Sequence, residues 1–186
     1  MQIGICGSHR TGKTTLAEAI SKKTGIPFLK TSTSAVFEQH GLDPAQPLDF
    51  ETRLWIQQRV IEAAVEVWKQ GAFVTDRTPL DFMAYTLAEC QGDTAVDFQK
   101  LEAYLNQCFK ATQKFFTKLV LVQPAIPLVY EQGKAALNRA YIEHLNIIIQ
   151  GLCHDERISC PAIIIERDII QIEARVQRVL ESLNRK

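Results

Sequence analysis

The feature that most constrains this chain stands near its beginning, where residues 7–14 read Gly-Ser-His-Arg-Thr-Gly-Lys-Thr. The segment matches G-x-x-x-x-G-K-[ST], the pattern of the phosphate-binding P-loop. Gly7 and Gly12 permit backbone torsions that a Cβ atom would forbid, so the loop amides can turn inward around phosphate oxygens. In this pattern Lys13 reaches the β- and γ-phosphates, while Thr14 offers its hydroxyl to Mg²⁺.

The residues around the motif have the strand–loop–helix order that it requires. Residues 2–6 form an apolar run of β type, and residues 13–23 carry apolar side chains on one helical face until Gly25 ends the helix. The positive end of this helix would point at a bound anion. The sequence therefore predicts an ATP site that comprises Gly7, Ser8, His9, Arg10, Thr11, Gly12, Lys13, Thr14 and Thr15.

The amino-acid composition is that of a globular protein and argues against several other classes. The 186 residues are 46% hydrophobic and 23% charged, which is typical of one globular domain. The 21 basic and 21 acidic residues balance, so no overall positive field attracts the chain to nucleic acid or to a membrane. The five cysteines form no C-x-x-C pair, which argues against a zinc site and fits free thiols in a reducing cytosol. We expect a cytoplasmic protein without a signal peptide, and no apolar run approaches the ~18 residues of a membrane span.

Strand and helix patterns alternate along the rest of the chain. Strands are expected at residues 2–6, 26–30, 72–76, 118–122 and 162–165. Helices are expected at residues 13–23, 48–70, 94–112 and 135–152, with another after Thr78-Pro79-Leu80-Asp81 and a last one capped by Asp168. The helix at 135–152 is expected to bury Leu137, Tyr141, Leu145, Ile148 and Leu152. Apolar strands separated by helices predict an α/β fold with a five-stranded parallel sheet covered on both faces.

Polar residues stand at the ends of these strands, where ligands bind in parallel sheets. Residues 31–34 follow the second strand, Asp76-Arg77 the third and Gln123 the fourth. P-loop enzymes usually hold Mg²⁺ with help from an Asp at such a strand end, and the fourth strand offers no carboxylate. We therefore expect Asp76 to bind magnesium together with Thr14 or to take a proton from the acceptor, and the sequence leaves both roles open. Arg77 is suited to clamp a phosphate oxygen.

Together, the P-loop and the element Asp76-Arg77-Thr78-Pro79-Leu80-Asp81-Phe82 resemble the P-loop kinases of small molecules. The likeness is nearest to the nucleoside and nucleotide kinase group, which includes thymidylate-kinase-like, deoxynucleoside-kinase-like and ribosylnicotinamide kinases and many phage-encoded enzymes. The resemblance covers most of the chain and implies a three-layer P-loop NTPase fold in a single domain, residues 1–186, with a small lid. It also implies that Asp76 is the base or metal helper and that Arg77 is the clamp between donor and acceptor.

The resemblance further implies a lid and an acceptor site. The lid would correspond to about residues 126–141, which carry fewer basic side chains than the several arginines usual in the family. The acceptor part would correspond to about residues 35–70. The residues expected to contact the substrate are Phe50, Arg53, Gln57, Gln58, Arg77 and Lys134, with Trp55 beside them. The residues expected to serve catalysis are Lys13, Asp76, Arg77 and the lid residue Arg139.

The favoured hypothesis is a Mg²⁺- and ATP-dependent kinase that transfers the γ-phosphoryl group to a nucleoside or a (deoxy)nucleoside monophosphate. A second hypothesis keeps this chemistry but takes as acceptor a hydroxymethylated base in DNA, as in phage DNA hypermodification; net neutrality disfavours it, because DNA-binding surfaces are basic. A third is an NTP-driven switch or motor, although the chain has no N-K-x-D motif. A fourth is a non-catalytic nucleotide-binding protein. A homodimer is compatible with each of them.

Overall fold

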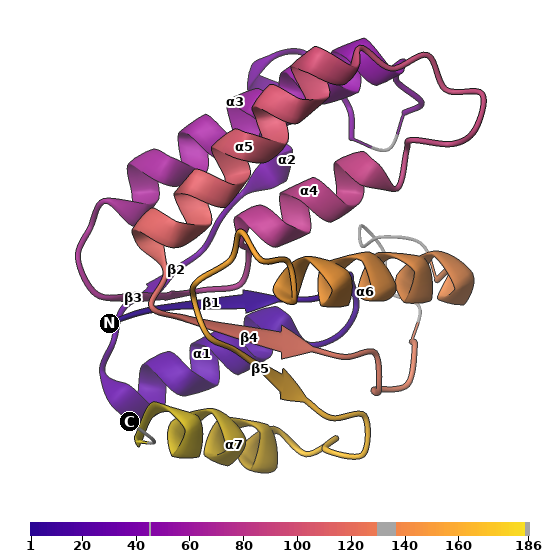
Figure 1. The fold of residues 1–186 in the computed structure, drawn as a ribbon. Helices are drawn as coiled ribbons and strands as arrows, with labels where there is room; N and C mark the ends of the chain where they lie inside the picture. The colour runs from indigo at the N-terminus through magenta and orange to yellow at the C-terminus, as the bar shows by residue number, and fades with distance from the viewer. Residues whose placement is uncertain (45, 130–136, 185–186) are drawn as a thin grey trace.

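The computed structural model describes residues 1–44, 46–129 and 137–184, with a parallel sheet at the centre (Figure 1). The strands of the sheet are β1 (Gln2–Cys6), β2 (Phe28–Leu29), β3 (Phe73–Thr75), β4 (Lys118–Val122) and β5 (Ala162–Ile165). They pair in the order β2-β3-β1-β4-β5, and all of these pairs are parallel. β1, which leads into the P-loop, therefore lies between two strands that are distant from it in sequence.

Helices cover both faces of the sheet. They are α1 (Lys13–Thr24), α2 (Thr33–Gln39), α3 (Phe50–Trp68), α4 (Pro79–Leu87), α5 (Phe98–Phe115), α6 (Arg139–Cys153) and α7 (Ile172–Asn184). α1 and α7 lie against one face, and α2 to α6 form a thicker layer on the other (Figure 1). Within that layer α4 contacts α3, α5 and α6, and α6 packs on β4. This arrangement confirms the three-layer α/β fold that the sequence predicts.

Alternate residues of the strands supply two hydrophobic cores, one on each face of the sheet. In β4, Leu119 and Leu121 belong to the core beneath α2 to α6, whereas Val120 and Val122 belong to the core that α1 and α7 cover. All four side chains are fully buried. A strand covered on both sides has no polar face, which explains why it reads as an unbroken apolar run.

Capping residues set several helix ends close to where the sequence predicts them. α1 ends at Gly25, whose φ of 74° is left-handed, and α3 begins after Asp49, whose carboxylate accepts a hydrogen bond from the Thr52 amide at 2.9 Å. α4 begins after Thr78, whose amide and hydroxyl both donate to the Asp81 carboxylate at 2.8 Å. A short, hydrogen-bonded turn thus joins β3 to α4.

The structure differs from the prediction after α1. β2 has two residues instead of five, and the polar run that follows it enters α2, a helix that the sequence analysis missed. Ser32 caps α2 by accepting a hydrogen bond from the Ala35 amide at 3.4 Å, and Phe37 is buried. Serine and threonine at residues 31–34 favour a loop, but they are equally suited to begin a helix. The helix that forms packs on α3 and buries Phe37, a long-range contact that the local pattern does not show.

The predicted cap of the last helix is wrong. α7 begins at Ile172, and the Arg175 amide donates to the Gln171 carbonyl at 3.1 Å, so Gln171 occupies the capping position. Asp168 lies in a turn four residues before the helix. The turn after β5 is therefore longer than the sequence suggests, because the chain must cross from the sheet edge to the face that α7 covers.

The inward face of α6 is shifted from the predicted one. Leu145 and Leu152 are buried as predicted, but Leu137 lies before the helix and is 37% exposed. The other buried apolar residues of the helix are Ile142 and Ile149. Three consecutive isoleucines at 147–149 offer two equally apolar stripes, and the stripe that contains Ile149 is the one that packs in the core shared with α4 and β4.

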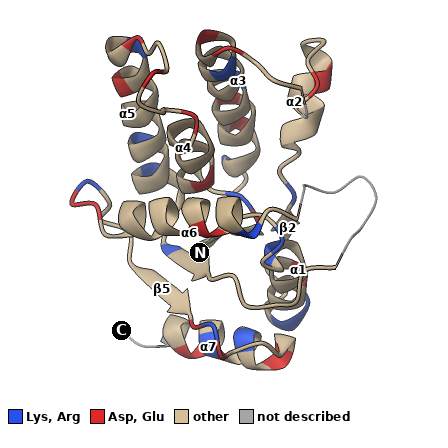
Figure 2. Cartoon of the chain, turned by 90° about the vertical axis from the view of Figure 1, so that its right-hand side faces the viewer, with Lys and Arg blue, Asp and Glu red and all other residues tan. Residues whose placement is uncertain are grey.

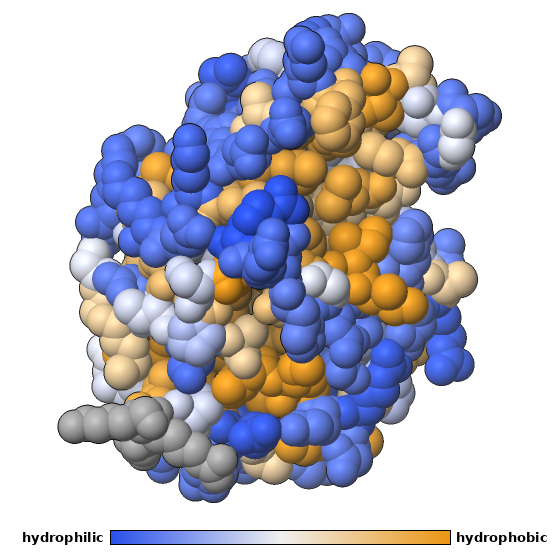
Figure 3. All heavy atoms as spheres, viewed as in Figure 1, coloured by the Kyte–Doolittle hydropathy of each residue, from blue (hydrophilic) through white to orange (hydrophobic). Residues whose placement is uncertain are grey.

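The surface is mostly hydrophilic on the face seen in Figure 3, with apolar atoms gathered between the upper helices and α6. Ile147 of α6 and Phe98 of α5 are 67% and 69% exposed. In the ranges that the structure describes, no helix combines the length and the apolar character needed to cross a membrane.

Candidate functional site

The P-loop turns sharply out of β1 because of its first glycine. Gly7 has a φ of 147°, and a Cβ atom built on it would lie 2.5 Å from the Val122 carbonyl oxygen at the end of β4. Only glycine fits at this position. The loop thus crosses the carboxyl ends of two central strands, where ligands bind in sheets of this kind.

Arg10 has left-handed backbone torsions without being a glycine. Its φ is 64°, a conformation that costs a non-glycine residue about 1–2 kcal/mol. Its guanidinium donates to the Val129 carbonyl at 2.9 Å. Arg10 therefore connects the P-loop to the start of the segment that was predicted to be a lid.

Lys13 lies inside the loop. Its side chain is 7% exposed, and its ammonium donates to the carbonyls of Gly7 and Ser8 at 2.6 and 2.7 Å. Burial, followed by the nearby Arg77 charge, lowers the pKa of Lys13 to about 8. The Lys13 ammonium is thus held close to the loop backbone, where a phosphate chain would meet it.

Asp76 and Thr14 form the second part of the site. β3 pairs with β1 so that Thr75 lies opposite Gly4, and the next residue, Asp76, reaches the P-loop helix. The Thr14 hydroxyl donates to Asp76 Oδ2 at 2.5 Å. The side chain of Asp76 is 6% exposed, and among the described residues its other oxygen, Oδ1, has no hydrogen-bond partner.

This pair of oxygen donors fits a hard divalent cation. Mg²⁺ prefers oxygen ligands and usually keeps several waters while it binds one or two protein oxygens and substrate phosphates. In the described parts of the chain no group of three or more His, Cys, Asp or Glu side chains could hold a metal. The unpartnered Asp76 Oδ1 and the Thr14 hydroxyl therefore suit a magnesium ion that takes its remaining ligands from phosphate and water.

Asp81 is a site residue whose importance the sequence analysis missed. Besides its two bonds from Thr78, it accepts a hydrogen bond from the Gly7 amide at 3.2 Å and lies 3.8 Å from the Lys13 ammonium. It is fully buried, and burial raises its pKa against the opposing charges of Lys13 and Arg77. The capping pattern identified Asp81 at the start of a helix, but no local pattern shows that this helix abuts the P-loop.

Arg77 and His9 meet aromatic rings of the helical layer. The Arg77 guanidinium lies 5.6 Å from the centre of the Tyr85 ring, and His9 Nδ1 lies 3.2 Å from the Tyr85 hydroxyl. The His9 ring is also 5.9 Å from the ring of Tyr141 in α6. Burial, followed by the charge of Glu89, raises the pKa of Tyr141 to about 12. These contacts place His9 between the P-loop and the helices α4 and α6.

A cavity of about 430 Å³ opens over the P-loop and brings the predicted donor residues together. Its lining consists of residues 9–15, Asp76, Arg77 and residues 126–129. Ser8 lies beneath it, fully buried, and its hydroxyl has no hydrogen-bond partner among the described residues. Residues 9–15 of the predicted ATP site therefore share one space with Asp76 and Arg77, whereas Gly7 and Ser8 do not line it.

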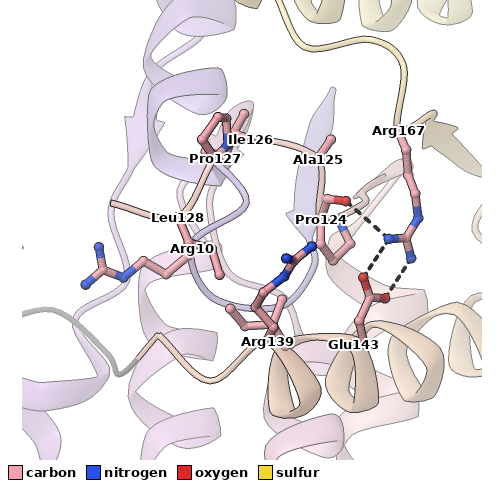
Figure 4. Close-up of a pocket in the computed structure, with 10 residues that line it drawn as sticks. Arg10, Pro124, Ala125, Ile126, Pro127, Leu128, Arg139, Glu143 and Arg167 are labelled. Atoms are coloured by element: carbon pink, nitrogen blue, oxygen red, sulfur yellow. Dashed lines mark hydrogen bonds and ion pairs between the residues drawn. The ribbon is translucent and has the colours of Figure 1, made fainter. Parts of the chain in front are cut away.

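A second cavity, of about 380 Å³, adjoins the first and shares Arg10 and residues 126–128 with it (Figure 4). Arg139, at the start of α6, extends toward the loop of residues 124–128 in this view. Arg167 is held at the rim by two hydrogen bonds to the Glu143 carboxylate, at 2.6 and 2.7 Å. The predicted lid arginine thus lines the adjoining cavity rather than the one over the P-loop. Lys134 lies outside the described residues, as do residues 130–136 of the predicted lid.

The predicted acceptor residues of α3 divide between two sides of the helix. Arg53 and Gln57 are one turn apart on the same face; the Arg53 Nε and the Gln57 Oε1 are buried and without a hydrogen-bond partner in the described chain. Phe50 is 9% exposed and belongs to the core of the helical layer. Gln58 instead lines a separate cavity of about 510 Å³ together with Trp55. The structure therefore brings Arg53 and Gln57 together and separates Gln58 from them.

Basic side chains concentrate near the candidate site. In Figure 2, Lys and Arg segments lie close together where the start of α1 meets the start of α6, while acidic and basic segments are interspersed over the other helices. Lys13 and Arg77, which line the cavity over the P-loop, supply positive charge there that suits an anionic ligand, although the whole chain is neutral.

Comparisons with known proteins agree with this geometry. A family model described as an AAA domain matches residues 2–132. No sequence among the curated proteins matches the chain. The solved structures that share its fold include deoxyadenosine kinase from M. mycoides, with a TM-score of 0.69, 19% identity and 99% of both chains covered.

Two other solved structures have the same fold. NadR protein in complex with NR has a TM-score of 0.69 and 16% identity; all of this chain aligns, but it spans only 51% of NadR. Thymidylate kinase from Candida albicans has a TM-score of 0.62 and 14% identity, with 98% of this chain and 90% of that chain covered. These likenesses confirm the fold that the sequence resemblance implies.

Proposed function

Because the chain belongs to the AAA domain family and has the fold of nucleoside and nucleotide kinases, we propose that it is an ATP- and magnesium-dependent kinase of a nucleoside or (deoxy)nucleoside monophosphate. The observation that carries this proposal is the Thr14–Asp76 pair. Its 2.5 Å contact lies beside the P-loop, and the unpartnered Asp76 oxygen is available to a metal ion or to an acceptor proton. A loop that only bound phosphate would not need this carboxylate.

The residues of the loop supply binding and positioning for the donor. The amides of the P-loop and the Lys13 ammonium hold the β- and γ-phosphates, so the γ-phosphoryl group is fixed before the acceptor arrives. Thr14 and Asp76 would hold magnesium, which would supply positive charge to neutralise the phosphates. Arg77 lies across the same cavity and stabilises the charge that spreads over the transferred group.

The acceptor approaches from the side of the helical layer. His9 of the P-loop contacts Tyr85 of α4 and Tyr141 of α6, and on α3 the buried Arg53 Nε and Gln57 Oε1 have no hydrogen-bond partner among the described residues. Unpaired buried donors and acceptors are costly unless a ligand satisfies them. They therefore suit the polar edge of a nucleobase or the hydroxyls of a sugar.

An ATP consumption screen tests the proposal. The purified protein is incubated with ATP and Mg²⁺ and, in turn, with nucleosides, their monophosphates and DNA that contains a hydroxymethylated base. We expect ADP formation to rise with one member of the first two classes and to require magnesium. If only the modified DNA stimulates ADP formation, the acceptor is a base in DNA and not a nucleoside or nucleotide. If ATP is hydrolysed and no acceptor stimulates the hydrolysis, the protein is a switch or motor and not a kinase.

A pair of neighbouring glutamines tests the acceptor side. Gln57→Ala is expected to raise the KM of the identified acceptor about 10-fold or more, while the KM for ATP stays within a factor of two. Gln58→Ala is the matched change at the next residue of α3, which lines a separate cavity, and we expect it to have a smaller effect. An equal effect of the two changes would argue that neither glutamine contacts the acceptor.

A further inference from the structure

Arg175 of α7 reaches the P-loop from the far end of the sequence. Its side chain is 2% exposed; its Nε donates to the Ile169 carbonyl at 2.8 Å, and its Nη1 donates to the Thr11 carbonyl at 2.9 Å. A Cβ atom built on Gly12 would lie 3.3 Å from the same Nη1. The guanidinium therefore packs against the Thr11–Gly12 peptide on the side of the loop opposite the cavity, whose lining does not include Arg175.

The charge of Arg175 is not balanced within the described residues. No carboxylate there forms an ion pair with it, and its Nη2 is buried without a hydrogen-bond partner. Burial lowers the pKa of Arg175. A buried cation without an acid beside it is costly, and such a cost is expected where the charge serves an anionic ligand.

The orientation of one peptide follows from this contact. The peptide unit is planar and trans, so its carbonyl and its N–H point in opposite directions. Because Arg175 holds the Thr11 carbonyl on the outer side, the Gly12 N–H must point to the inner side of the loop. Gly12 has a φ of 87° and no side chain, so this peptide has little else to keep it from turning over.

We propose that Arg175 is a positioning residue of the phosphate site: it fixes the Thr11–Gly12 peptide with its N–H toward the bound phosphates and adds a positive charge behind the loop. A charge-assisted hydrogen bond to the carbonyl polarises the peptide and strengthens its N–H as a donor. The inference rests on the proposed nucleotide binding of the P-loop, and it does not depend on which acceptor the protein uses.

The experiment measures ADP and inorganic tripolyphosphate affinity by calorimetry for wild type, Arg175→Met and Arg175→Lys. Arg178→Met is the matched control, because Arg178 lies on the same helix and pairs with Glu166 at 3.0 Å at the surface. We expect Arg175→Met to weaken both ligands about 10-fold or more and Arg175→Lys to lie between it and wild type, since a lysine keeps the charge but loses the two-pronged geometry. Arg178→Met should bind both ligands as wild type does.

A spectroscopic readout separates positioning from a general structural role. In ¹H–¹⁵N spectra the Gly12 amide signal should shift on addition of tripolyphosphate in wild type. This shift should be lost in Arg175→Met and reduced in Arg175→Lys, while the rest of the spectrum remains that of the folded protein. If Arg175→Met does not fold, Arg175→Lys carries the same comparison. If the Arg175 variants bind both ligands as wild type does, or if their Gly12 amide responds as in wild type, the inference about Arg175 is wrong, but the proposed function stands. Wild-type protein that binds neither ADP nor tripolyphosphate would overturn the proposed function as well.

Discussion

Most of the chemistry that we propose depends on individual charged side chains that are buried. Lys13 is almost wholly buried among loop carbonyls, and its pKa of about 8 lies far below that of an exposed lysine. Asp76 is also buried, and one of its oxygens has no hydrogen-bond partner in the part of the chain that the structure describes. Burying these two charged groups is unfavourable in the ligand-free protein, and a bound nucleotide with its metal would offset that free-energy cost.

The pH dependence of stability should reveal the state of Lys13. Because burial lowers its pKa from 10.5 to about 8, the folded chain binds fewer protons than the unfolded chain between these two pH values. The free energy of unfolding should therefore rise with pH over this window, by up to about 3 kcal/mol. Lys13→Met removes this rise, and chemical denaturation at pH 7.5 to 10.5 without nucleotide measures it.

Lys22→Met is the control, because Lys22 is an exposed residue of the same helix. This variant should keep the pH dependence of wild type. A Lys13→Met curve that runs parallel to that of wild type would mean that the Lys13 ammonium is well solvated and that the proposed burial is incorrect.

Asp76→Asn should separate catalysis from binding. The amide keeps the size of the side chain but removes the charge that would hold magnesium or accept a proton, so we expect kcat to fall about 10²–10⁴-fold. The dissociation constant of ATP should change much less, because the loop amides and Lys13 remain. Steady-state kinetics and calorimetry measure the two quantities, with the exposed Asp93→Asn as control. Equal losses of turnover and affinity would assign Asp76 a structural role.

Among the structural elements, the junction of β3 and α4 has the largest influence on the site. The Asp81 carboxylate caps α4 through Thr78 and at the same time holds the Gly7 amide at the first residue of the P-loop. One side chain thus joins a helix start to the phosphate-binding backbone. The position of α4 and the shape of the loop cannot vary independently.

Asp81→Ala should therefore reduce both stability and binding. Removing the buried carboxylate leaves the amides of Gly7 and Thr78 unpaired, which should lower the free energy of unfolding by about 2–5 kcal/mol. Asp81→Asn keeps an oxygen acceptor and should lose less. Thr78→Ala, which removes the hydroxyl together with the buried γ-methyl group, should cost about 1–2 kcal/mol. Urea denaturation gives these values, and a loss from Asp81→Ala no larger than that from Thr78→Ala would contradict the assigned contacts.

Across the whole molecule, the features that could be predicted from the sequence are those that a single local pattern determines. The glycine and lysine spacing of residues 7–14, the unbroken apolar run of β4 and the Thr78–Asp81 cap each predicted what the structure contains. Other features depend on contacts between distant segments. The Arg175 bond to Thr11 spans 164 residues, and no neighbouring residue indicates it. α2 was missed for a related reason, because the helix packs on α3, a contact that its own residues do not indicate.

Ligand binding should stabilise the folded protein as a unit. ATP with Mg²⁺ at 100 times its dissociation constant should raise the free energy of unfolding by about 2.7 kcal/mol if the unfolded chain does not bind it. Thermal unfolding at increasing ATP concentration measures the effect. Lys13→Ala should shift much less at the same concentrations. Equal shifts of the two proteins would place the nucleotide somewhere other than the P-loop.

The strand order has a consequence for how such a protein can change. β1 and β3 are direct neighbours, so backbone pairing in the interior, together with the β3–α4 junction, sets the spacing between Thr14 and Asp76, and α2 and α3 do not. Insertions or exchanges in α2 and α3 can therefore change which acceptor the protein binds, while the residues that bind ATP keep their arrangement. A laboratory graft of these two helices from a relative is the natural route to a new specificity.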